Sequence, residues 1–534
     1  MDFPGPSTHL FRALQVGFHS SYSDSEAFQT RSGNVSKPRE HMLLSLTNNT
    51  TAIACLCLIT SVIILRILRQ GLTNPLNKVP GPWYGRWTNI PLKLAVVCGR
   101  RIHYVHTLHE KYGPYVRISP NEIAVNDPRG FKQIHGIGSG FTKAEWYLHL
   151  VDLDRPGVFA MTDQKAHAVR RKMFARPFSK THLREHWEST VREKVDLALS
   201  RMQGELRTAG IVDVLKWWTL MATDVSSTLM FGDCFHTLED GEVNEYIRTL
   251  TRTLLGQGIG AELPLIRTVD KMLPLQAAKE LFRNNDYLMN YGMVAVDNMK
   301  SQQGGKNIFA NVMAEAEKGE KLQDADVQVE ATGLLIAGTD TTAVSLTYLV
   351  WAVLSHPTVK NALEAEVDKL PQGYKEADLE TLPILNGVIE ETLRLYGAAP
   401  GMLPRAVPSA GADVGGFYLP PGTVATTQSY SLHRDPSIFP EPESFRLERW
   451  YDATSQYRLN DTAKAIFSPF GAGSRTCLGI HLAYMELRVA AVGFFRQISK
   501  NVMLSPSCTA ECMEQENYFL IAPAGHKCEV MLKG

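Results

Sequence analysis

The sequence has no excess of charge of either sign and contains few cysteines. Its 534 residues include 55 basic and 55 acidic side chains, so the formal net charge at pH 7 is zero. No basic tract with interleaved aromatic residues is present, which argues against a protein that binds nucleic acid. The 8 cysteines are too sparse for a disulfide framework in a chain of this length, and none has the spacing of a zinc knuckle. This cysteine usage fits a reducing, cytosol-facing compartment.

The chain also lacks internal repeats and low-complexity linkers, which argues against a repeat array or a string of small modules. No glycine-rich fingerprint of a flavin or dinucleotide site is present. The main body of the chain is also too short to hold a fused reductase domain.

One long segment near the N-terminus has no charge. No charged residue occurs from Met42 to Leu65, and at about 1.5 Å per residue this stretch could cross a hydrocarbon core of about 30 Å. Asn48 and Asn49 shorten the strictly apolar part, and a buried core helix is the alternative. We expect a transmembrane anchor over residues 42–68. Residues 1–41 are polar and Ser-rich, and we expect them to be disordered.

A basic, proline-rich hinge is expected over residues 69–89, which include Val79-Pro80-Gly81-Pro82-Trp83. Proline restricts the backbone, so this segment should hold the body, residues 90–534, against the membrane. Basic residues lie on both sides of the anchor, and the positive-inside rule alone gives a near tie. If translation began at Met42, the basic residues before the anchor would be absent. Those that remain would all follow the anchor, and the body would then face the cytosol.

The body is predicted to be mainly α-helical with a small β region. Helical patterns cover residues 166–176, 185–207, 216–231, 276–300, 324–355, 357–369, 383–396 and 478–495. Short strands are expected at residues 115–118, 123–125, 416–419 and 423–427.

The segment from Phe470 to Gly479 reads Phe-Gly-Ala-Gly-Ser-Arg-Thr-Cys-Leu-Gly. Cys477 is the candidate iron ligand, because a single thiolate can hold haem iron and push electron density onto it. Glycines such as Gly473 and Gly479 allow tight turns and a close approach to a flat macrocycle. Arg475 can donate to a haem propionate, and Phe470 can stack beneath the ring. A buried cysteine in a glycine-rich loop is the alternative.

These residues match the Phe-x-x-Gly-x-Arg-x-Cys-x-Gly signature, and the chain therefore resembles the cytochrome P450 family. The resemblance implies the cytochrome P450 fold, haem b as the cofactor and Cys477 as the axial ligand of its iron. The segments 111–122 and 433–442 are most similar to membrane-anchored members from filamentous fungi, many of which act in secondary metabolism.

The predicted helix over residues 324–355 contains Ala337-Gly-Thr-Asp-Thr-Thr342 in its middle. A glycine inside a helix costs about 1 kcal/mol relative to alanine, so Gly338 suggests a local opening that makes room for dioxygen. Asp340 and Thr341 would then relay protons. The hexapeptide also matches the oxygen-activating motif of the resembled family. A tolerated glycine beside satisfied core threonines is the alternative.

Glu391 and Arg394 lie three residues apart and share one face of a predicted helix. Arg449 follows downstream, and in the resembled family such residues form a buried triad that holds the core behind the cysteine loop. An exposed ion pair is the alternative. Leu447 stands where family members often have proline.

Three more residues are predicted to anchor haem propionates by the same resemblance: His167, Arg171 and Arg405. His167 stands where the family often has tryptophan. Surface salt bridges are the alternative for each residue.

The resemblance predicts an apolar pocket whose walls are residues 146–159, 398–403 and 518–519, together with Leu334 and Ala337. It implies a monooxygenase that hydroxylates, epoxidises or further oxidises an apolar small molecule, such as a polyketide or terpenoid intermediate. Dioxygen is the second substrate. Electrons would come from an NADPH–cytochrome P450 reductase, with cytochrome b5 as a second candidate donor. Basic residues expected at the docking surface are Arg170, Lys172, Arg176 and Lys464.

The resemblance also implies a single-pass protein of the endoplasmic reticulum membrane. Two other functions stay open from the sequence. The first is a haem-thiolate isomerase or dehydratase that needs no dioxygen, against which the Asp340-Thr341 pair argues. The second is a non-catalytic haem sensor.

Overall fold

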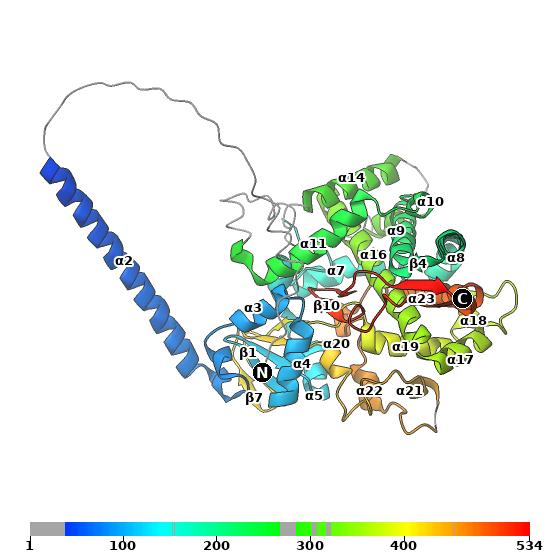
Figure 1. Ribbon diagram of the computed structural model, residues 1–534. Helices are drawn as coiled ribbons and strands as arrows, with labels where there is room; N and C mark the ends of the chain where they lie inside the picture. The colour runs from blue at the N-terminus through cyan, green and yellow to red at the C-terminus, as the bar shows by residue number, and fades with distance from the viewer. Residues whose placement is uncertain are drawn as a thin grey trace, which may run out of the picture.

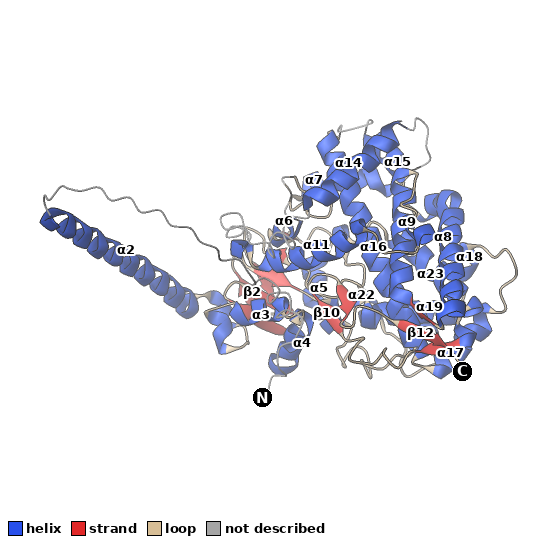
Figure 2. Cartoon of the chain, turned by 45° about the horizontal axis from the view of Figure 1, so that its top comes forward, coloured by secondary structure: helices blue, strands red, loops and turns tan. Residues whose placement is uncertain are grey.

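The computed structural model describes residues 38–151, 153, 155–266, 285–301, 307–316, 322–452 and 454–534. A mainly helical body carries small β-sheets at several places between the base of one long N-terminal helix and the C-terminus, and this helix extends away from the body (Figures 1 and 2). The prediction of a mainly α-helical fold with a small β region is confirmed. The prediction of disorder for residues 1–41 falls on residues outside the described part of the chain, except for Pro38 to His41, which begin this helix.

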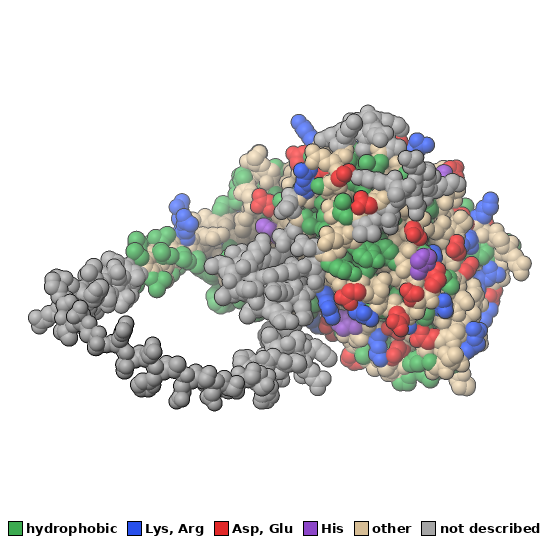
Figure 3. Space-filling model, turned by 90° about the horizontal axis from the view of Figure 1, so that it is seen from above, with side chains coloured by type: hydrophobic (Ala, Val, Ile, Leu, Met, Phe, Trp, Pro, Cys, Tyr) green, Lys and Arg blue, Asp and Glu red, His purple; other side chains and the backbone are tan. Residues whose placement is uncertain are grey.

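Helix α2 (Pro38–Thr73) contains the predicted anchor. Its part Ala54–Thr73 is long and apolar enough to cross a membrane, with a mean hydropathy of 1.8, and only 6% of this window is buried. Hydrophobic side chains cover this part of the helix where it leaves the body (Figure 3). A buried core helix, the alternative that the sequence left open, is therefore wrong for this segment.

The proline-rich segment after α2 lies on the first strand of the body. The backbone N–H of Arg117 donates to the carbonyl of Pro80 at 2.7 Å, and the Arg117 guanidinium donates to Asn77. A Cβ at Gly81 would lie 2.4 Å from the Arg117 carbonyl oxygen, so this close approach requires glycine. The contact fixes the direction in which α2 leaves the body.

The main sheet has the order β1-β2-β8-β5-β3. It contains β1 (Tyr115–Ser119), β2 (Glu122–Val125), β8 (Val424–Thr426), β5 (Arg405–Ala406) and β3 (Thr142–Lys143). Strands β2 and β8 run parallel, and the other pairs are antiparallel. The pairing of β3 with β5 sets Lys143 opposite Arg405, and this register brings two cations from distant parts of the chain together.

Three smaller sheets complete the β structure. They pair β6 (Ala412–Val414) with β7 (Phe417–Leu419), β10 (Gln515–Asn517) with β11 (Ile521–Pro523), and β12 (Glu529–Leu532) with both β4 (Ile211–Asp213) and β9 (Val502–Leu504).

Helix α16 (Asp324–Leu354) runs through the helical core. It packs against α9 (Val214–Phe231), α14 (Asn285–Ser301), α19 (Pro383–Tyr396) and α23 (Ile480–Gln497). A capping box between Gln323 and Asp326 begins α16, and the helix ends just before His356-Pro357, where proline disfavours continuation. Most of its side chains are buried on every face, as expected of a core helix rather than a surface helix.

The remaining helices surround this core. They are α3 (Ile90–Val97), α4 (Arg101–Tyr112), α5 (Pro128–His135), α6 (Trp146–Val151), α7 (Gln164–Ala175), α8 (Lys180–Ala209), α10 (Thr237–Asp240), α11 (Glu245–Glu262), α15 (Ile308–Ala316), α17 (Pro357–Val367), α18 (Glu376–Leu379), α20 (Ser429–Leu432), α21 (Glu448–Tyr451) and α22 (Asp461–Ile466), with short 3-10 turns η1 (Pro75–Lys78), η2 (Trp83–Arg86), η3 (Gly473–Arg475) and η4 (Ser499–Asn501). All eight predicted helices have counterparts, although the prediction over 276–300 begins among residues that the structure does not describe.

The structure brings the three residues of the predicted triad together in the core. The Glu391 carboxylate accepts two hydrogen bonds from Arg394, both at 2.8 Å, and one from Arg449 at 3.2 Å. All three side chains are fully buried. Arg394 also donates to the backbone carbonyls of His433 and Pro442, so the cluster joins α19 to the segment that precedes the cysteine loop.

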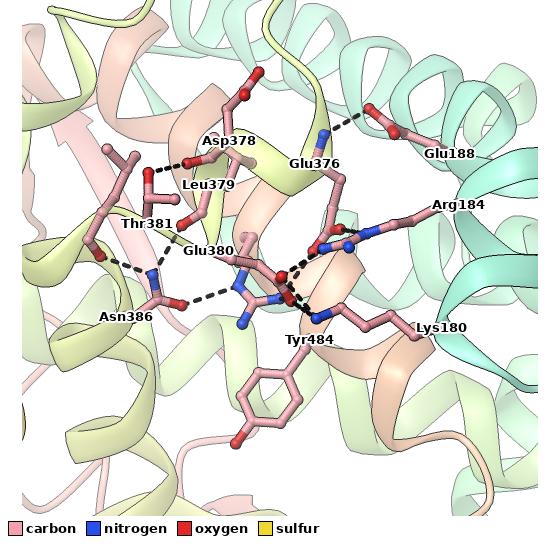
Figure 4. A network of polar contacts seen from close by, with 12 residues as sticks. Lys180, Arg184, Glu188, Glu376, Asp378, Leu379, Glu380, Thr381, Asn386 and Tyr484 are labelled. Carbon is pink, nitrogen blue, oxygen red and sulfur yellow. Dashed lines mark hydrogen bonds and ion pairs between the residues drawn. The ribbon is translucent and has the colours of Figure 1, made fainter.

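A second polar network joins α8, α18 and α23, which are distant in the sequence (Figure 4). Arg184 on α8 contacts both Glu376 and Glu380, at 2.5 and 2.7 Å. Arg488 on α23 contacts the same two carboxylates at 2.8 and 3.2 Å, and Lys180 contacts Glu380 at 2.5 Å. These ion pairs hold the start of α8 against α23, the helix that follows Cys477.

Removal of the Glu391 charge should destabilise the whole body. In Glu391→Gln, Arg394 and Arg449 would remain buried without a counter-charge, which costs about 3–5 kcal/mol. We expect the free energy of unfolding, measured with urea by tryptophan fluorescence, to fall by that amount. Asp368→Asn removes the same charge from the exposed Lys500–Asp368 pair and should cost less than about 1 kcal/mol. Equal losses in the two variants would contradict a structural role for the triad.

Candidate functional site

The loop that carries Cys477 is held in a tight conformation directly before α23. Gly471 and Gly473 have φ values of +73° and +66°, which L side chains rarely adopt. A Cβ at Gly473 would also lie 2.0 Å from the carbonyl oxygen of His135. The backbone N–H of Cys477 donates to the Phe470 carbonyl at 2.9 Å. The sequence therefore needs glycine at Gly473 for two independent reasons.

The Cys477 side chain is exposed, although protein atoms surround it on most sides. Desolvation raises the pKa of its thiol, whereas the backbone N–H of Gly479 and the positive charge of Arg171 oppose that shift. The sulfur also lies just before the first turn of α23, where the partial positive charge of a helix N-terminus favours a thiolate. A metal bound to this sulfur would complete the stabilisation of the thiolate.

Five basic side chains gather beside the cysteine loop. They come from β3, β5, α7 and η3: Lys143, Arg405, His167, Arg171 and Arg475. Among the described residues, no carboxylate forms an ion pair with any of them, although the charge of Asp163 acts on Arg475. Four of the five, His167, Arg171, Arg405 and Arg475, line a cavity of about 520 Å³. The arrangement is a buried to half-buried group of basic side chains that has no ion-paired carboxylate in the described part of the chain.

Electrostatics within this group are unfavourable in the absence of an anion. Desolvation lowers the pKa of Lys143 well below its usual value, and the charges of Arg405, Arg475 and Arg171 lower it further. Desolvation and the same kind of repulsion lower the pKa of Arg475 to about 10. The Nε of Arg405 is buried without a hydrogen-bond partner. Each effect would be relieved by an anionic ligand that accepts hydrogen bonds here.

The residues present fit haem. A sulfur that could bind iron lies within reach of the Arg171 charge, and the basic side chains beside it would suit two propionate groups. Arg475 donates to the Met161 carbonyl at 2.7 Å, which fixes its guanidinium near the cavity. The structure thus places Arg171, Arg405 and Arg475 in one group, as the sequence predicts.

His167 lies in the same group and was predicted to bind a propionate as a cation. Desolvation and then the charges of Arg475 and Arg171 lower its pKa to about 3. This environment favours the neutral imidazole, which can contribute an N–H hydrogen bond.

Lys143 was missed by sequence reasoning. Its side chain is buried, it donates to the Phe159 carbonyl, and its ammonium lies 3.9 Å from the centre of the Tyr147 ring. Nothing in the local sequence indicates this role, because the β3–β5 pairing that sets it beside Arg405 joins segments more than two hundred residues apart.

The predicted oxygen-activating segment lies in the middle of α16. Ala337 is exposed and Thr341 is partly exposed, although the helix around them is mostly buried. The Thr341 hydroxyl donates to the Ala337 carbonyl at 2.8 Å. Desolvation raises the pKa of the Asp340 carboxyl to about 6. An acid with this pKa can both give and accept a proton near neutral pH.

The local opening expected at Gly338 is not seen, since α16 is continuous from Asp324 to Leu354. The glycine has a packing reason instead. A Cβ at Gly338 would lie 2.2 Å from the hydroxyl oxygen of Ser226 on α9. Gly338 therefore allows α9 and α16, the most extensively packed pair of helices, to approach closely.

Two of the predicted pocket walls meet in an aromatic cluster. The ring of Phe519 lies 6.1 Å from that of Trp146 and 5.8 Å from that of Phe159. Tyr147 packs edge-on against Phe159 at 5.6 Å, and the Phe159 side chain is 44% exposed. Segments 146–159 and 518–519 thus form one apolar surface next to Lys143.

The segment between this aromatic cluster and α7 connects the parts of the site. The backbone N–H of Val158 donates to the Glu330 carboxylate of α16 at 2.8 Å, and Arg170 of α7 donates to the same carboxylate at 2.9 Å. Arg475 contacts Met161. The cysteine loop, the cation-bearing helix and α16 are therefore held by one short stretch of chain.

The expected docking surface also requires a correction. Arg170 is mostly buried and ion-paired with Glu330 and Asp326, so it is not available to a partner protein. Lys172, Arg176 and Lys464 are exposed.

Comparison with known proteins shows the family of this chain. The family model described as Cytochrome P450 matches residues 80–525. The chain is similar to Cytochrome P450 monooxygenase tazI of Aspergillus terreus, with 39% identity over 90% of this chain and 98% of that protein. It is also similar to Cytochrome P450 monooxygenase stcB of Emericella nidulans, with 37% identity over 94% of this chain and 98% of that protein. A third relative is Cytochrome P450 monooxygenase aflV of Aspergillus parasiticus, with 38% identity over 88% of this chain and 94% of that protein. The chain therefore belongs to the cytochrome P450 family of haem-thiolate monooxygenases.

Proposed function

We propose that Cys477 is the iron ligand in this chain and that the enzyme inserts oxygen from dioxygen into an apolar small molecule. The observation that carries this proposal is the cysteine sulfur beside a group of basic side chains that has no ion-paired carboxylate among the described residues. When bound there, haem supplies the activation of dioxygen. The product would be an alcohol, an epoxide or a further oxidised species.

The cations would bind and orient the cofactor. Arg171, Arg405 and Arg475 would hold the propionates, with Lys143 as a fourth donor and neutral His167 as a hydrogen-bond donor. Phe470, which packs against Tyr484 with ring centres 5.2 Å apart, would limit access of water to the sulfur. The N–H of Gly479 would keep the sulfur in its thiolate form.

Asp340 and Thr341 would handle the protons of the reaction. The Asp340 carboxyl, with its pKa near 6, can take up a proton from solvent and release it at its Oδ atoms. The Thr341 hydroxyl lies on the same turn and is anchored at the Ala337 carbonyl, which sets its position. Gly338 would contribute by permitting the α9–α16 packing that holds this turn in place.

The substrate would lie against an apolar wall. Trp146, Phe159 and Phe519 supply aromatic surface, and the exposed Ala337 on α16 leaves room beside Thr341. Such a wall suits a bulky neutral molecule, as expected for an intermediate of a fungal polyketide or terpenoid pathway. The fungal origin of the relatives supports this class.

The described part of α2 would anchor the protein in the endoplasmic reticulum membrane with the body in the cytosol, and the hinge over residues 69–89 would set its tilt. Electrons would come from an NADPH–cytochrome P450 reductase or from cytochrome b5. Lys172, Arg176 and Lys464 would attract such an acidic partner.

Replacement of Thr341 tests the monooxygenase function. In Thr341→Ala, product formed per NADPH consumed should fall about tenfold or more, because proton delivery is worth about 10²-fold or more in rate. Thr339→Ala is a matched control: Thr339 also donates to the carbonyl four residues earlier, at 3.0 Å, but is fully buried. In Thr339→Ala, the product formed per NADPH consumed should stay near the wild-type value. An unchanged ratio in Thr341→Ala, or turnover without NADPH and dioxygen, would favour the isomerase function instead.

Asp340 should give the reaction a pH dependence. Since the raised pKa of about 6 leaves less of the protonated acid as pH rises, we expect product per NADPH to fall between about pH 5 and pH 7 in the wild type, about one unit on either side of that pKa. Asp340→Asn should form less product per NADPH than the wild type, and this ratio should not change over the same pH interval. Parallel profiles for the two proteins would show that another group titrates.

The docking surface can be tested by charge removal. The double variant Lys172→Gln/Arg176→Gln should raise the reductase concentration that gives half-maximal turnover, and the difference should shrink at high ionic strength because salt screens exposed charges. Lys500→Gln, in the turn after α23, is the control and should behave like the wild type. Equal reductase requirements in all three proteins would exclude this surface.

A further inference from the structure

A second group of metal-binding side chains lies away from the cysteine loop, at the junction of α9 and α10. Within the turn from Asp233 to Glu239, the chain offers a carboxylate, a thiol, an imidazole and a second carboxylate, from Asp233, Cys234, His236 and Glu239. One donor atom from each of the first three lies within 4.8 Å of the other two. None of these residues contributes to the monooxygenase site described above.

The distances among Cys234, His236 and Glu239 suit a tetrahedral ion. The sulfur of Cys234 lies 3.4 Å from Nδ1 of His236, and the same Nδ1 lies 3.8 Å from the Glu239 carboxylate. The Asp233 carboxylate lies 3.9 Å from Nε2, the other ring nitrogen of His236. Zinc bonds of about 2.3 Å to sulfur and about 2.0–2.1 Å to nitrogen place those two atoms about 3.6 Å apart in a tetrahedral site. The Cys234–His236 pair is therefore already near the required spacing.

The Cys234 sulfur already accepts a hydrogen bond from within the protein. The Lys194 ammonium donates to the Cys234 sulfur at 3.3 Å and lies 3.5 Å from the Glu239 carboxylate. Lys194 is mostly buried, whereas the Asp233 and His236 side chains are 63% and 62% exposed. The ammonium can thus keep its hydrogen bond to the sulfur from within the protein, as outer-shell donors do at metal sites, while an ion reaches the sulfur and imidazole from solvent.

We propose that Cys234, Nδ1 of His236 and Glu239 bind a divalent transition-metal ion of the zinc class, with Asp233 or a water molecule as the fourth ligand. Thiolate and imidazole ligands select zinc and similar ions over magnesium and calcium, which take oxygen ligands. Binding would release the thiol proton of Cys234 to solvent as the metal–sulfur bond forms. The ion would tie the end of α9 to α10 and, through Lys194, to α8.

The experiment uses the full-length haem-loaded protein, purified without a polyhistidine tag and treated with a chelator. Zinc chloride is added, and two quantities are measured: zinc retained per haem after dialysis, and the rate at which iodoacetamide alkylates Cys234, followed by mass spectrometry of its peptide. We expect one retained zinc ion and at least a tenfold slower alkylation, reversed by the chelator. Zinc should be lost in Cys234→Ser and reduced at least tenfold in affinity in His236→Asn.

A matched control addresses folding and unspecific binding. His236 has a φ of +55°, and asparagine tolerates this conformation, so His236→Asn should keep its fold and its haem content. His526 also has a positive φ of +51°, is exposed, and lies 3.8 Å from the Glu516 carboxylate. His526→Asn should bind zinc like the wild type. Alkylation of Cys234 that does not respond to zinc, or retained zinc that is equal in wild type, Cys234→Ser and His236→Asn, would overturn the proposal.

Discussion

The site depends on an electrostatic constraint: several buried cations share one region without a carboxylate partner among the described residues. Desolvation lowers the pKa values of Lys143 and Arg475, and the charge of Arg405 lowers both further. Proteins rarely bury charge without compensation, because the desolvation of a single ion costs several kcal/mol. A dianionic ligand would compensate these positive charges, and the sulfur beside them is suited to bind a metal that the ligand carries. Haem meets both conditions.

The rest of the body holds these parts in register. Glu391 binds two arginines in the core and ties α19 to the chain that leads into the cysteine loop. The carboxylates that Arg184 and Arg488 share hold α8 against α23. Glu330 connects α16 to α7 and to the aromatic wall. Each of these contacts joins segments that are distant in the sequence, so the geometry of the site is a property of the whole fold.

The sequence predicted the features that short segments determine. The cysteine loop could be recognised because its glycines, arginine and cysteine lie within ten residues, and α16 because its apolar run ends at His356-Pro357. Features set by tertiary contacts could not be predicted. Lys143 enters the site through the β3–β5 register, and Gly338 is explained by Ser226 on another helix. Burial favours the neutral form of His167, and Glu330 withdraws Arg170 from the surface.

The most direct test of this account is the absorption spectrum of the ferrous carbonyl complex, measured on the purified full-length protein and on Cys477→His. The account predicts the thiolate-type spectrum for the wild type and its loss in Cys477→His, with an imidazole-type spectrum or no bound haem in that variant. Cys508→Ser, which changes another partly buried cysteine, should keep the wild-type spectrum. An imidazole-type spectrum in the wild type, or a thiolate-type spectrum that survives in Cys477→His, would contradict the account.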